Sequence, residues 1–207
     1  VNEILAKDAQ LKALRSQISP HFLYNTLETI NWRAKAMGNE VISQMVESLG
    51  NLLRVSLSSQ KTLVTLAYEL ELVDSYITIQ KIRFEERLDY RTQIPEHVKD
   101  ALIPPLTLQP LVENSIHYAL EEIMETCYIT IMAEAIPEDA CDSTPRLRIL
   151  VKNSGSAFDD NLLELLRTER KQPNRSGIGL LNIDKRIKLL FGDAYGLSLY
   201  NEEDCAV

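Results

Sequence analysis

Apolar residues recur with helical spacing from the start of the chain. Ile4, Leu11 and Ile18 follow one another seven residues apart, with Leu14 between them, which predicts a helix that presents an apolar stripe to a partner helix. A proline inside a helix removes one hydrogen bond and bends the axis, so we expect a bend at Pro20 within one long helix over residues 1–37. The apolar face continues beyond the bend through Leu23, Leu27, Ile30 and Ala34.

A second helix is predicted after the Gly38-Asn39 pair, which interrupts the apolar pattern. Two helices joined by so short a turn form an antiparallel hairpin. A lone hairpin buries too little apolar surface, so we expect residues 1–61 to form a dimerisation domain that pairs with a second copy in a four-helix bundle, which makes the protein a homodimer. The apolar positions of the second helix are Ile42, Met45, Leu49 and Leu52.

Helices and strands alternate from residue 62 to residue 207. Thr65 is the predicted N-cap of a helix whose stripe consists of Leu66, Leu70, Val73, Ile77 and Phe84. Strands are expected over residues 88–94, 128–136, 147–152 and 197–200, and further helices ending near 120 and spanning 161–167 and 178–190. The alternation predicts an α/β domain, an α+β sandwich with helices on one face of a mixed sheet.

Charge and composition exclude several classes of function. The net charge is −8, with 30 acidic against 22 basic residues, and the basic residues are scattered, so no nucleic-acid partner is expected. The three cysteines show no paired spacing, which indicates neither a disulfide framework nor a zinc site and fits a reducing cytosol. No apolar run approaches the ~18 residues that cross a bilayer, so we expect a cytoplasmic region that is attached to the cell membrane only through a segment upstream of Val1.

The first candidate for chemistry is His21, which lies seven residues after Leu14 and therefore at the edge of the predicted bundle. A neutral imidazole keeps one unprotonated nitrogen that can act as a nucleophile. Asn25 follows one helical turn later on the same face, where its amide can hold a water molecule or a phosphoryl oxygen. A histidine and an asparagine in a bundle are more often packing or register residues, and this reading stays open.

The second candidate is the helix around Asn114. Its residues Val112, Ser115, Ile116 and Ala119 fall on one face, so Glu113, Asn114 and His117 are expected to point away from the sheet together. An amide oxygen is a good ligand for Mg²⁺, which takes few protein ligands and completes its shell with phosphate and water. A plain solvated helix face is the alternative.

Two glycine-containing segments complete the set. Gly155 follows a predicted strand, where a simple turn is the alternative reading. Gly177 and Gly179 open a predicted helix, whose free N–H groups and dipole favour phosphate. This short motif is neither a P-loop nor a Rossmann fingerprint.

The order of these segments resembles the sensor histidine kinases of the LytS/YesM type in two-component systems, whose ATP-binding domain is of the GHKL (Bergerat) class. The stretch PHFLYNT around His21 is similar to the phosphoacceptor box of the family, and LIPPLTLQPLVENSI, with Glu113 and Asn114, is similar to its N box. VKNSG stands where the G1 box belongs, and SGIGLLNIDKRIKLLFG is similar to the G2 box. The resemblance covers essentially the whole chain.

The resemblance implies a role for each segment. His21 accepts the γ-phosphoryl group of ATP and passes it to an aspartate in the receiver domain of a response regulator, while Glu113 orients a nucleophile or water. Asn114 holds Mg²⁺ against the phosphates, and residues 159–176 form a mobile ATP lid. The remaining nucleotide contacts are expected at His117, Tyr118, Asn153, Gly155, Ser176, Gly177, Gly179 and Leu180.

The chain departs from the family pattern at the adenine end of the site. The G1 box usually begins with an aspartate that accepts a hydrogen bond from the adenine amino group, whereas this chain has Asn153, and Ala157 replaces a glycine. The family's Lys-His-Gly after the N box is His117-Tyr118-Ala119 here, which removes a cation, and the family's terminal strand is expected beyond Val207. We therefore expect weak ATP binding.

Two other functions remain as alternatives. One is a non-catalytic dimeric signalling module whose degenerate GHKL domain binds nucleotide poorly. The other is a GHKL ATPase or a protein kinase that acts on serine. The histidine at the edge of the hairpin argues against the second alternative.

Overall fold

The structure is a computed structural model that describes residues 20–58, 61–121, 126–136, 146–155, 157–158, 162–168, 175–202 and 205–207. The chain divides into two compact units, Val1–Ser59 and Gln60–Val207. The part of the predicted long helix before Pro20 lies outside the described residues, as does its stripe of Ile4, Leu11, Leu14 and Ile18.

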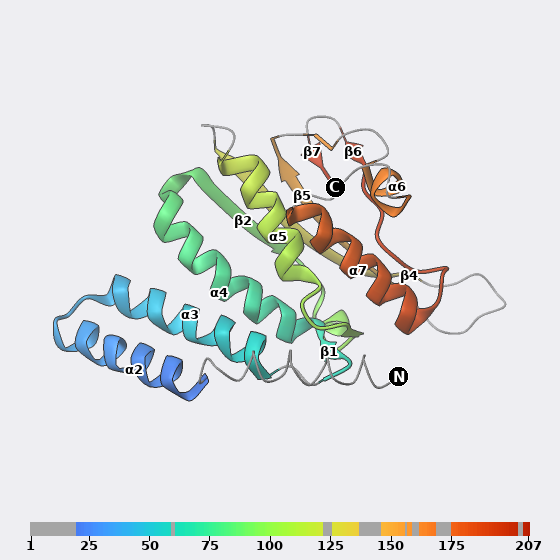
Figure 1. Cartoon of the computed structure of the whole chain (residues 1–207). Helices are drawn as coiled ribbons and strands as arrows, with labels where there is room; N and C mark the ends of the chain where they lie inside the picture. The colour runs from blue at the N-terminus through green and yellow to red at the C-terminus, as the bar shows by residue number, and fades with distance from the viewer. Residues whose placement is uncertain are drawn as a thin grey trace. The chain divides into compact units, whose positions relative to one another are not determined.

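Two antiparallel helices make up the described part of the first unit (Figure 1): α2, Pro20–Ala36, and α3, Glu40–Ser58. The break predicted at Gly38-Asn39 is confirmed. Gly38 takes a positive φ of 68°, and Asn39 caps α3 because its Oδ1 accepts a hydrogen bond from the backbone N–H of Ile42 at 3.1 Å. Further along the pair, Asn31 of α2 donates to Glu47 of α3 at 3.0 Å.

A five-stranded mixed sheet, in the order β2-β4-β5-β7-β6, forms the centre of the second unit. The strands β2 and β4 are parallel, and every other pair in this sheet is antiparallel. A separate two-stranded ladder joins β1, Val64–Thr65, to β3, Leu102–Ile103. The sheet strands are β2 (Leu88–Gln93), β4 (Cys127–Ile136), β5 (Arg146–Ser154), β6 (Asn201–Glu202) and β7 (Cys205–Ala206).

Helices cover one face of this sheet, as the alternation of elements predicts (Figure 1). They are α4 (Leu66–Phe84), α5 (Leu108–Ile116) and α7 (Arg175–Phe191), with a shorter α6 (Leu162–Arg167) packed on α7. Short 3₁₀ turns at Glu85–Arg87 and Glu96–Val98 flank β2, and a turn of π-helix at His117–Glu121 continues α5.

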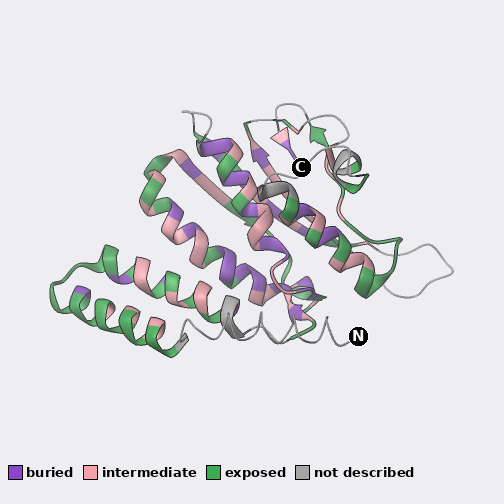
Figure 2. Ribbon diagram, in the orientation of Figure 1, coloured by how far each residue is buried: buried purple, intermediate pink, exposed green. Residues whose placement is uncertain are grey.

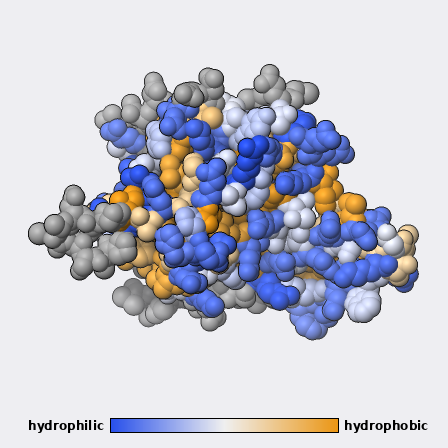
Figure 3. Space-filling model, turned by 180° about the vertical axis from the view of Figure 1, so that it is seen from behind, coloured by the Kyte–Doolittle hydropathy of each residue, from blue (hydrophilic) through white to orange (hydrophobic). Residues whose placement is uncertain are grey.

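The core lies between the helices and the sheet, where buried residues gather (Figure 2). Along β4 burial alternates strictly at first, because Cys127, Ile129, Ile131 and Ala133 face the helices. The strand positions between them, Tyr128, Thr130 and Met132, are exposed or partly exposed. From behind, the molecule presents mainly hydrophilic side chains with apolar ones between them (Figure 3). The alternation of buried and exposed positions along β4 is typical of a sheet with one face covered.

Thr65 caps α4 as predicted, since its hydroxyl accepts a hydrogen bond from Tyr68 N at 3.2 Å. The strand predicted over residues 197–200 is wrong. The backbone N–H of Leu197 donates to Asp184 and its carbonyl accepts from Arg167. Of the predicted strand, Tyr200 exchanges two backbone hydrogen bonds with Val207, at 3.1 and 2.9 Å, next to the β6–β7 pair. Short strands follow at β6 and β7 instead.

A buried carboxylate from α4 holds the start of α5. The side chain of Glu69 is fully buried and accepts hydrogen bonds from the backbone N–H groups of Leu106, Thr107 and Leu108 at 2.7, 2.8 and 2.9 Å. These are amides that a helix start leaves without partners, and the positive end of the helix dipole adds to the attraction. Thr107, the residue before α5, makes no side-chain cap bond, and its hydroxyl donates to the carbonyl of Pro104.

Replacing this carboxylate should destabilise the second unit strongly. In Glu69→Gln an amide NH₂ replaces one of the oxygens and faces backbone donors, so we expect a loss of about 3 kcal/mol in the free energy of unfolding. Urea denaturation followed by circular dichroism measures it. Glu71→Gln, an exposed change on the same helix, should stay within about 0.5 kcal/mol of the wild type. Equal stability of the two variants would contradict the capping role.

Candidate active site

The predicted phosphoacceptor and its neighbour lie together on the exposed side of α2. His21 and Asn25 are both exposed, and Asn25 Nδ2 lies 3.2 Å from His21 Nδ1. In this orientation the amide donates to Nδ1, which leaves the ring proton on Nε2. A half-turn of the amide would instead offer its oxygen to an N–H at Nδ1 and leave the lone pair on Nε2. The asparagine is therefore placed to select which ring nitrogen is nucleophilic.

A cavity of about 810 Å³ opens in the second unit beside β5. Its walls come from α5, from β5, from the first turns of α7 and from residues 194–200. Its volume lies within the range of small-molecule and cofactor sites. Four of the predicted site residues line it: Asn114, Tyr118, Asn153 and Leu180.

The N-box helix does not divide its faces as the sequence predicts. Val112, Ser115, Ile116 and Ala119 are buried as expected. Asn114, however, does not lie on the same side of the helix as Glu113 and His117. It lines the cavity, and its Nδ2 is buried without a hydrogen-bond partner among the described residues. Asn114 lies on a different side of the helix from Glu113 because successive side chains along a helix are turned by about 100°.

Glu113 and His117 lie exposed on the outer side of this helix, outside the cavity lining. Glu113 accepts a hydrogen bond from Gln109 Nε2 at 2.8 Å. The His117 ring meets the Tyr118 ring edge-on at 5.0 Å. A π-helical turn begins at His117, and within it Tyr118 lines the cavity.

Asn153 lies at the end of β5 and is 4% exposed. Its Nδ2 donates to the carbonyl of Ser154 at 3.2 Å, so its Oδ1 is the atom that remains to accept a hydrogen bond from a ligand. Gly155 follows with a φ of 114°, a conformation that favours glycine, and turns the chain away from the strand. The next described residues, Ala157 and Phe158, line the same cavity.

The glycine-containing helix begins earlier than predicted. Because α7 starts at Arg175, the N–H groups left without helical partners belong to residues 175–178, and Gly179 lies inside the helix. Ser176 and Gly177 lie in the first turn, and Leu180 is buried against the cavity. Of the predicted lid, the structure describes α6 with Thr168 and the first residues of α7; its other residues lie outside the description.

Metal ligation in this region would depend on amide and phosphate oxygens. Among the described residues no group of three His, Cys, Asp or Glu side chains is placed to hold an ion. Asn114 lines the cavity, and its Oδ1 is an amide oxygen of the kind that binds Mg²⁺ largely ligated by phosphate and water. Its unsatisfied buried Nδ2 is a hydrogen-bond donor and suits a phosphate oxygen. In the part of the chain described, no helix is both long and apolar enough to span a bilayer.

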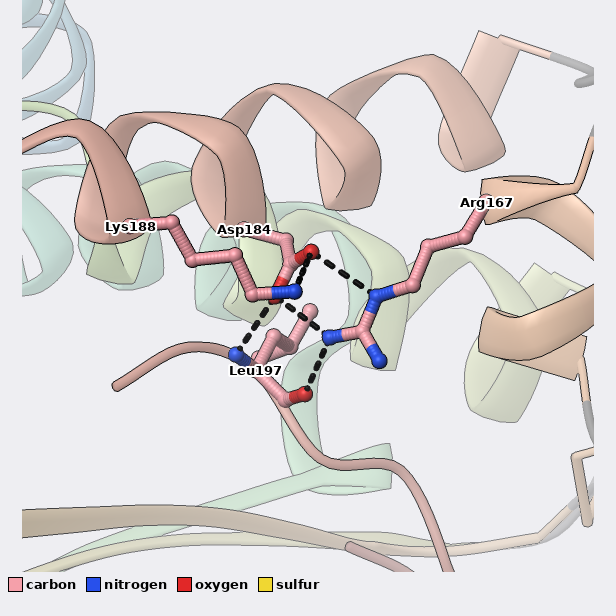
Figure 4. Close-up of polar contacts among 4 residues, drawn as sticks. All are labelled: Arg167, Asp184, Lys188 and Leu197. Carbon is pink, nitrogen blue, oxygen red and sulfur yellow. Dashed lines mark hydrogen bonds and ion pairs between the residues drawn. The ribbon is translucent and has the colours of Figure 1, made fainter. Parts of the chain in front are cut away.

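Sequence reasoning missed a cluster of charged groups behind the cavity wall, formed by Arg167, Asp184, Lys188 and the backbone of Leu197 (Figure 4). Arg167 of α6 donates from Nε and Nη2 to the two oxygens of Asp184 on α7, at 2.9 and 2.6 Å. Lys188 and the N–H of Leu197 bind the same carboxylate, at 3.0 and 2.9 Å. The i, i+4 spacing of Asp184 and Lys188 was the only signal available in the sequence.

These contacts shift the pKa of Asp184. Burial, the largest effect, raises the pKa of the carboxyl group, but hydrogen bonds from Arg167, from the Leu197 amide and from Lys188 together outweigh it and lower the pKa to about 2. The side chain is only 2% exposed, so solvent screens these contacts little. Asp184 is therefore ionised throughout the physiological range.

Comparison with known proteins gives consistent matches. A family model described as "Histidine kinase" matches residues 9–88. The chain is 46% identical to sensor histidine kinase YesM of Bacillus subtilis, over 98% of the chain and 33% of that protein. It is 29% identical to sensor protein LytS of Staphylococcus haemolyticus, over 96% of the chain and 33% of that protein. The chain thus spans about a third of the length of these curated relatives.

A solved structure, the catalytic domain of histidine kinase ThkA, aligns with a TM-score of 0.49 at 20% identity and covers 70% of this chain and 90% of that one.

The Asp184 cluster should give stability a defined dependence on pH. A carboxyl whose folded pKa is depressed stabilises the fold fully above its unfolded pKa, near 4, and loses that contribution as the pH falls through the folded value of about 2. We expect Asp184→Asn to be less stable than the wild type by about 2 kcal/mol at pH 7, with the difference shrinking between about pH 4 and pH 2. Urea denaturation at several pH values measures it; a difference that is constant with pH would contradict the assignment.

Proposed function

Since this chain belongs to the histidine kinase family and is of the LytS/YesM type, we propose that it is the kinase core of a sensor histidine kinase, in which His21 takes the γ-phosphoryl group of ATP bound in the second unit. The observation that carries this proposal is the cavity. It gathers Asn114, Tyr118, Asn153 and Leu180, which come from three separate sequence segments in the order of the family's motifs. A phosphoacceptor and a nucleotide site in separate units of one chain form a self-phosphorylating kinase.

The cavity has the polar groups that a nucleotide requires at each end. At one end Asn153 offers its free Oδ1 to the amino group of adenine, while Phe158 and Tyr118 supply aromatic surface. At the other end Leu180 follows the first turn of α7, where the unpartnered N–H groups and the helix dipole favour phosphate. We further assign backbone contacts with the nucleotide to Gly155, Ser176, Gly177 and Gly179, which lie close to these residues in the sequence.

Asn114 is the proposed ligand of Mg²⁺ through its Oδ1, because the residue lines the cavity. Its buried Nδ2, which has no hydrogen-bond partner among the described residues, is left to donate to a phosphate oxygen. When bound, Mg-ATP supplies the phosphoryl group and neutralises charge that develops during its transfer. Glu113 and His117 lie outside the cavity, on the exposed face of the same helix. We assign Glu113 to orienting the incoming imidazole or a water molecule, and His117 to a peripheral nucleotide contact.

At the acceptor, Asn25 fixes the tautomer of His21. The structure has Asn25 Nδ2 at 3.2 Å from Nδ1, and the proposed reactive arrangement has the amide turned by 180°. Its Oδ1 then accepts from an N–H at Nδ1, leaves the lone pair of Nε2 to attack phosphorus, and stabilises positive charge that develops on the ring. Both side chains are exposed, so the ring is accessible to the nucleotide and afterwards to an aspartate of a response regulator receiver domain. Phosphoryl transfer to that aspartate completes the proposed cycle.

The helical pair has the exposed apolar surface of an incomplete bundle. Phe22, Trp32 and Met37 of α2 and its turn are 68%, 70% and 82% exposed, and Val41, Ile42 and Leu49 of α3 are also exposed (Figure 2). So much exposed apolar surface on two helices indicates a partner. A second copy of the chain, which would form a four-helix bundle, is the proposed partner.

Labelling with γ-labelled ATP and Mg²⁺ tests the reaction. The wild type should gain label that is lost in acid, as a phosphohistidine is, and His21→Ala should abolish it. His97→Ala, which removes an exposed histidine of the second unit, is the matched control and should label like the wild type. No label on a folded dimer would favour the non-catalytic signalling module, and label stable in acid would favour a kinase for serine.

Nucleotide affinity tests the adenine end of the site. Because Asn153 offers a neutral acceptor where the family has a charged one, calorimetric titration with Mg-ATP should give a Kd in the micromolar range or weaker. Asn153→Ala should weaken binding by about tenfold through loss of the acceptor, whereas Asn51→Ala on exposed α3 should change nothing. Sub-micromolar binding by the wild type would overturn this expectation.

A further inference from the structure

The Asp184 cluster joins three segments that are distant in sequence and takes no part in the phosphoryl transfer proposed above. Arg167 ends α6, Asp184 and Lys188 lie on α7, and Leu197 belongs to the segment that walls the cavity (Figure 4). Both carboxylate oxygens are fully engaged: Oδ1 accepts from Arg167 and Leu197, and Oδ2 accepts from Arg167 and Lys188. A carboxylate used in this way cannot act as an acid, a base or a metal ligand.

We propose that Asp184 is a positioning residue for the nucleotide, because it holds the end of α6 and the cavity-lining residues Gly196 and Leu197 against α7. The identity of the ligand rests on the function proposed above. The structural part of the inference, that the Asp184 carboxylate fixes both segments, is independent of that function.

The backbone of Leu197 connects the cavity lining to the cluster. Its N–H donates to Asp184 and its carbonyl accepts from Arg167 at 3.1 Å. Leu197 and the neighbouring Gly196 both line the cavity, as do residues 147–151 of β5. The cluster therefore ties two cavity-lining residues to α6 and α7 through the Leu197 backbone.

Gly196 shows how closely the wall approaches the carboxylate. It has a φ of 152°, and a Cβ at this position would lie 2.7 Å from Asp184 Oδ1, well inside contact distance. Gly192, a few residues earlier, also has a positive φ, of 97°, but a Cβ there would meet no atom within 4 Å. Comparing alanine substitutions at the two glycines therefore separates the effect of backbone conformation from the effect of the contact with Asp184.

Hydrogen–deuterium exchange and calorimetry with Mg-ATP, on the full chain, test the proposal together. Asp184→Asn should speed amide exchange in residues 162–168 and 195–199 and weaken Mg-ATP binding by about tenfold. The matched control is Asp89→Asn, which breaks the exposed Asp89–Arg91 pair on β2 and should leave both readouts unchanged. Unchanged exchange in both segments of Asp184→Asn, or unchanged affinity, would overturn the positioning role.

Three further variants keep the test decisive if Asp184→Asn fails to fold. Arg167→Gln should free residues 162–168 more than 195–199, because Asp184 still holds the Leu197 N–H, and Arg167→Lys, which retains the charge, should restore part of the affinity. Gly196→Ala should weaken Mg-ATP binding more than Gly192→Ala, and equal effects of these two would count against the proposal.

The two proposals fail in different ways. If the wild type binds no Mg-ATP, the proposed kinase function fails. The exchange pattern of the variants still decides whether Asp184 fixes the wall.

Discussion

The bond between the Glu69 carboxylate and the start of α5 is the interaction on which the second unit depends. One side chain from α4 satisfies the three backbone N–H groups of Leu106, Thr107 and Leu108, in a place without water to replace it. It also holds Leu106 at a positive φ of 57°, a conformation that costs a non-glycine residue about 1–2 kcal/mol. The direction of α5, and with it the position of Asn114 at the cavity, follows from this contact.

Asp184 has the same physical role on the other side of the cavity. Each of these carboxylates is buried, each accepts hydrogen bonds from backbone N–H groups of a segment that lacks partners of its own, and each joins elements distant in sequence. They differ in charge compensation. Asp184 has Arg167 and Lys188 beside it, whereas the described bonds of Glu69 are to backbone amides alone at the positive end of a helix. The cavity thus lies between two helices that are each fixed by a buried carboxylate.

The acceptor and the cavity place opposite demands on their surroundings. His21 lies on an exposed helix face beside Asn25, and in the proposed reaction it must be reached by two different partners in turn. In the proposed nucleotide site the cavity residues need burial and fixed positions, and Asn153 and Leu180 are buried. Dividing these tasks between two units lets an exposed acceptor and an enclosed binding site belong to one chain.

The sequence by itself determined the features that depend on local spacing. These include the break at Gly38-Asn39, the Thr65 cap, the buried face of Val112 and Ser115, and the mixed sheet with helices on one face. The motif order also identified the family. Tertiary structure decided the separation of Asn114 from Glu113, the early start of α7 at Arg175, and the absence of a strand at residues 197–200. In that last case Asp184 and Arg167, distant in the chain, bind the backbone of Leu197, while Tyr200 pairs with Val207. Helix caps and apolar stripes depend on residues within one or two turns of each other in the sequence. The hydrogen-bond partner of a backbone group in a loop depends on which donor or acceptor the tertiary fold brings near it.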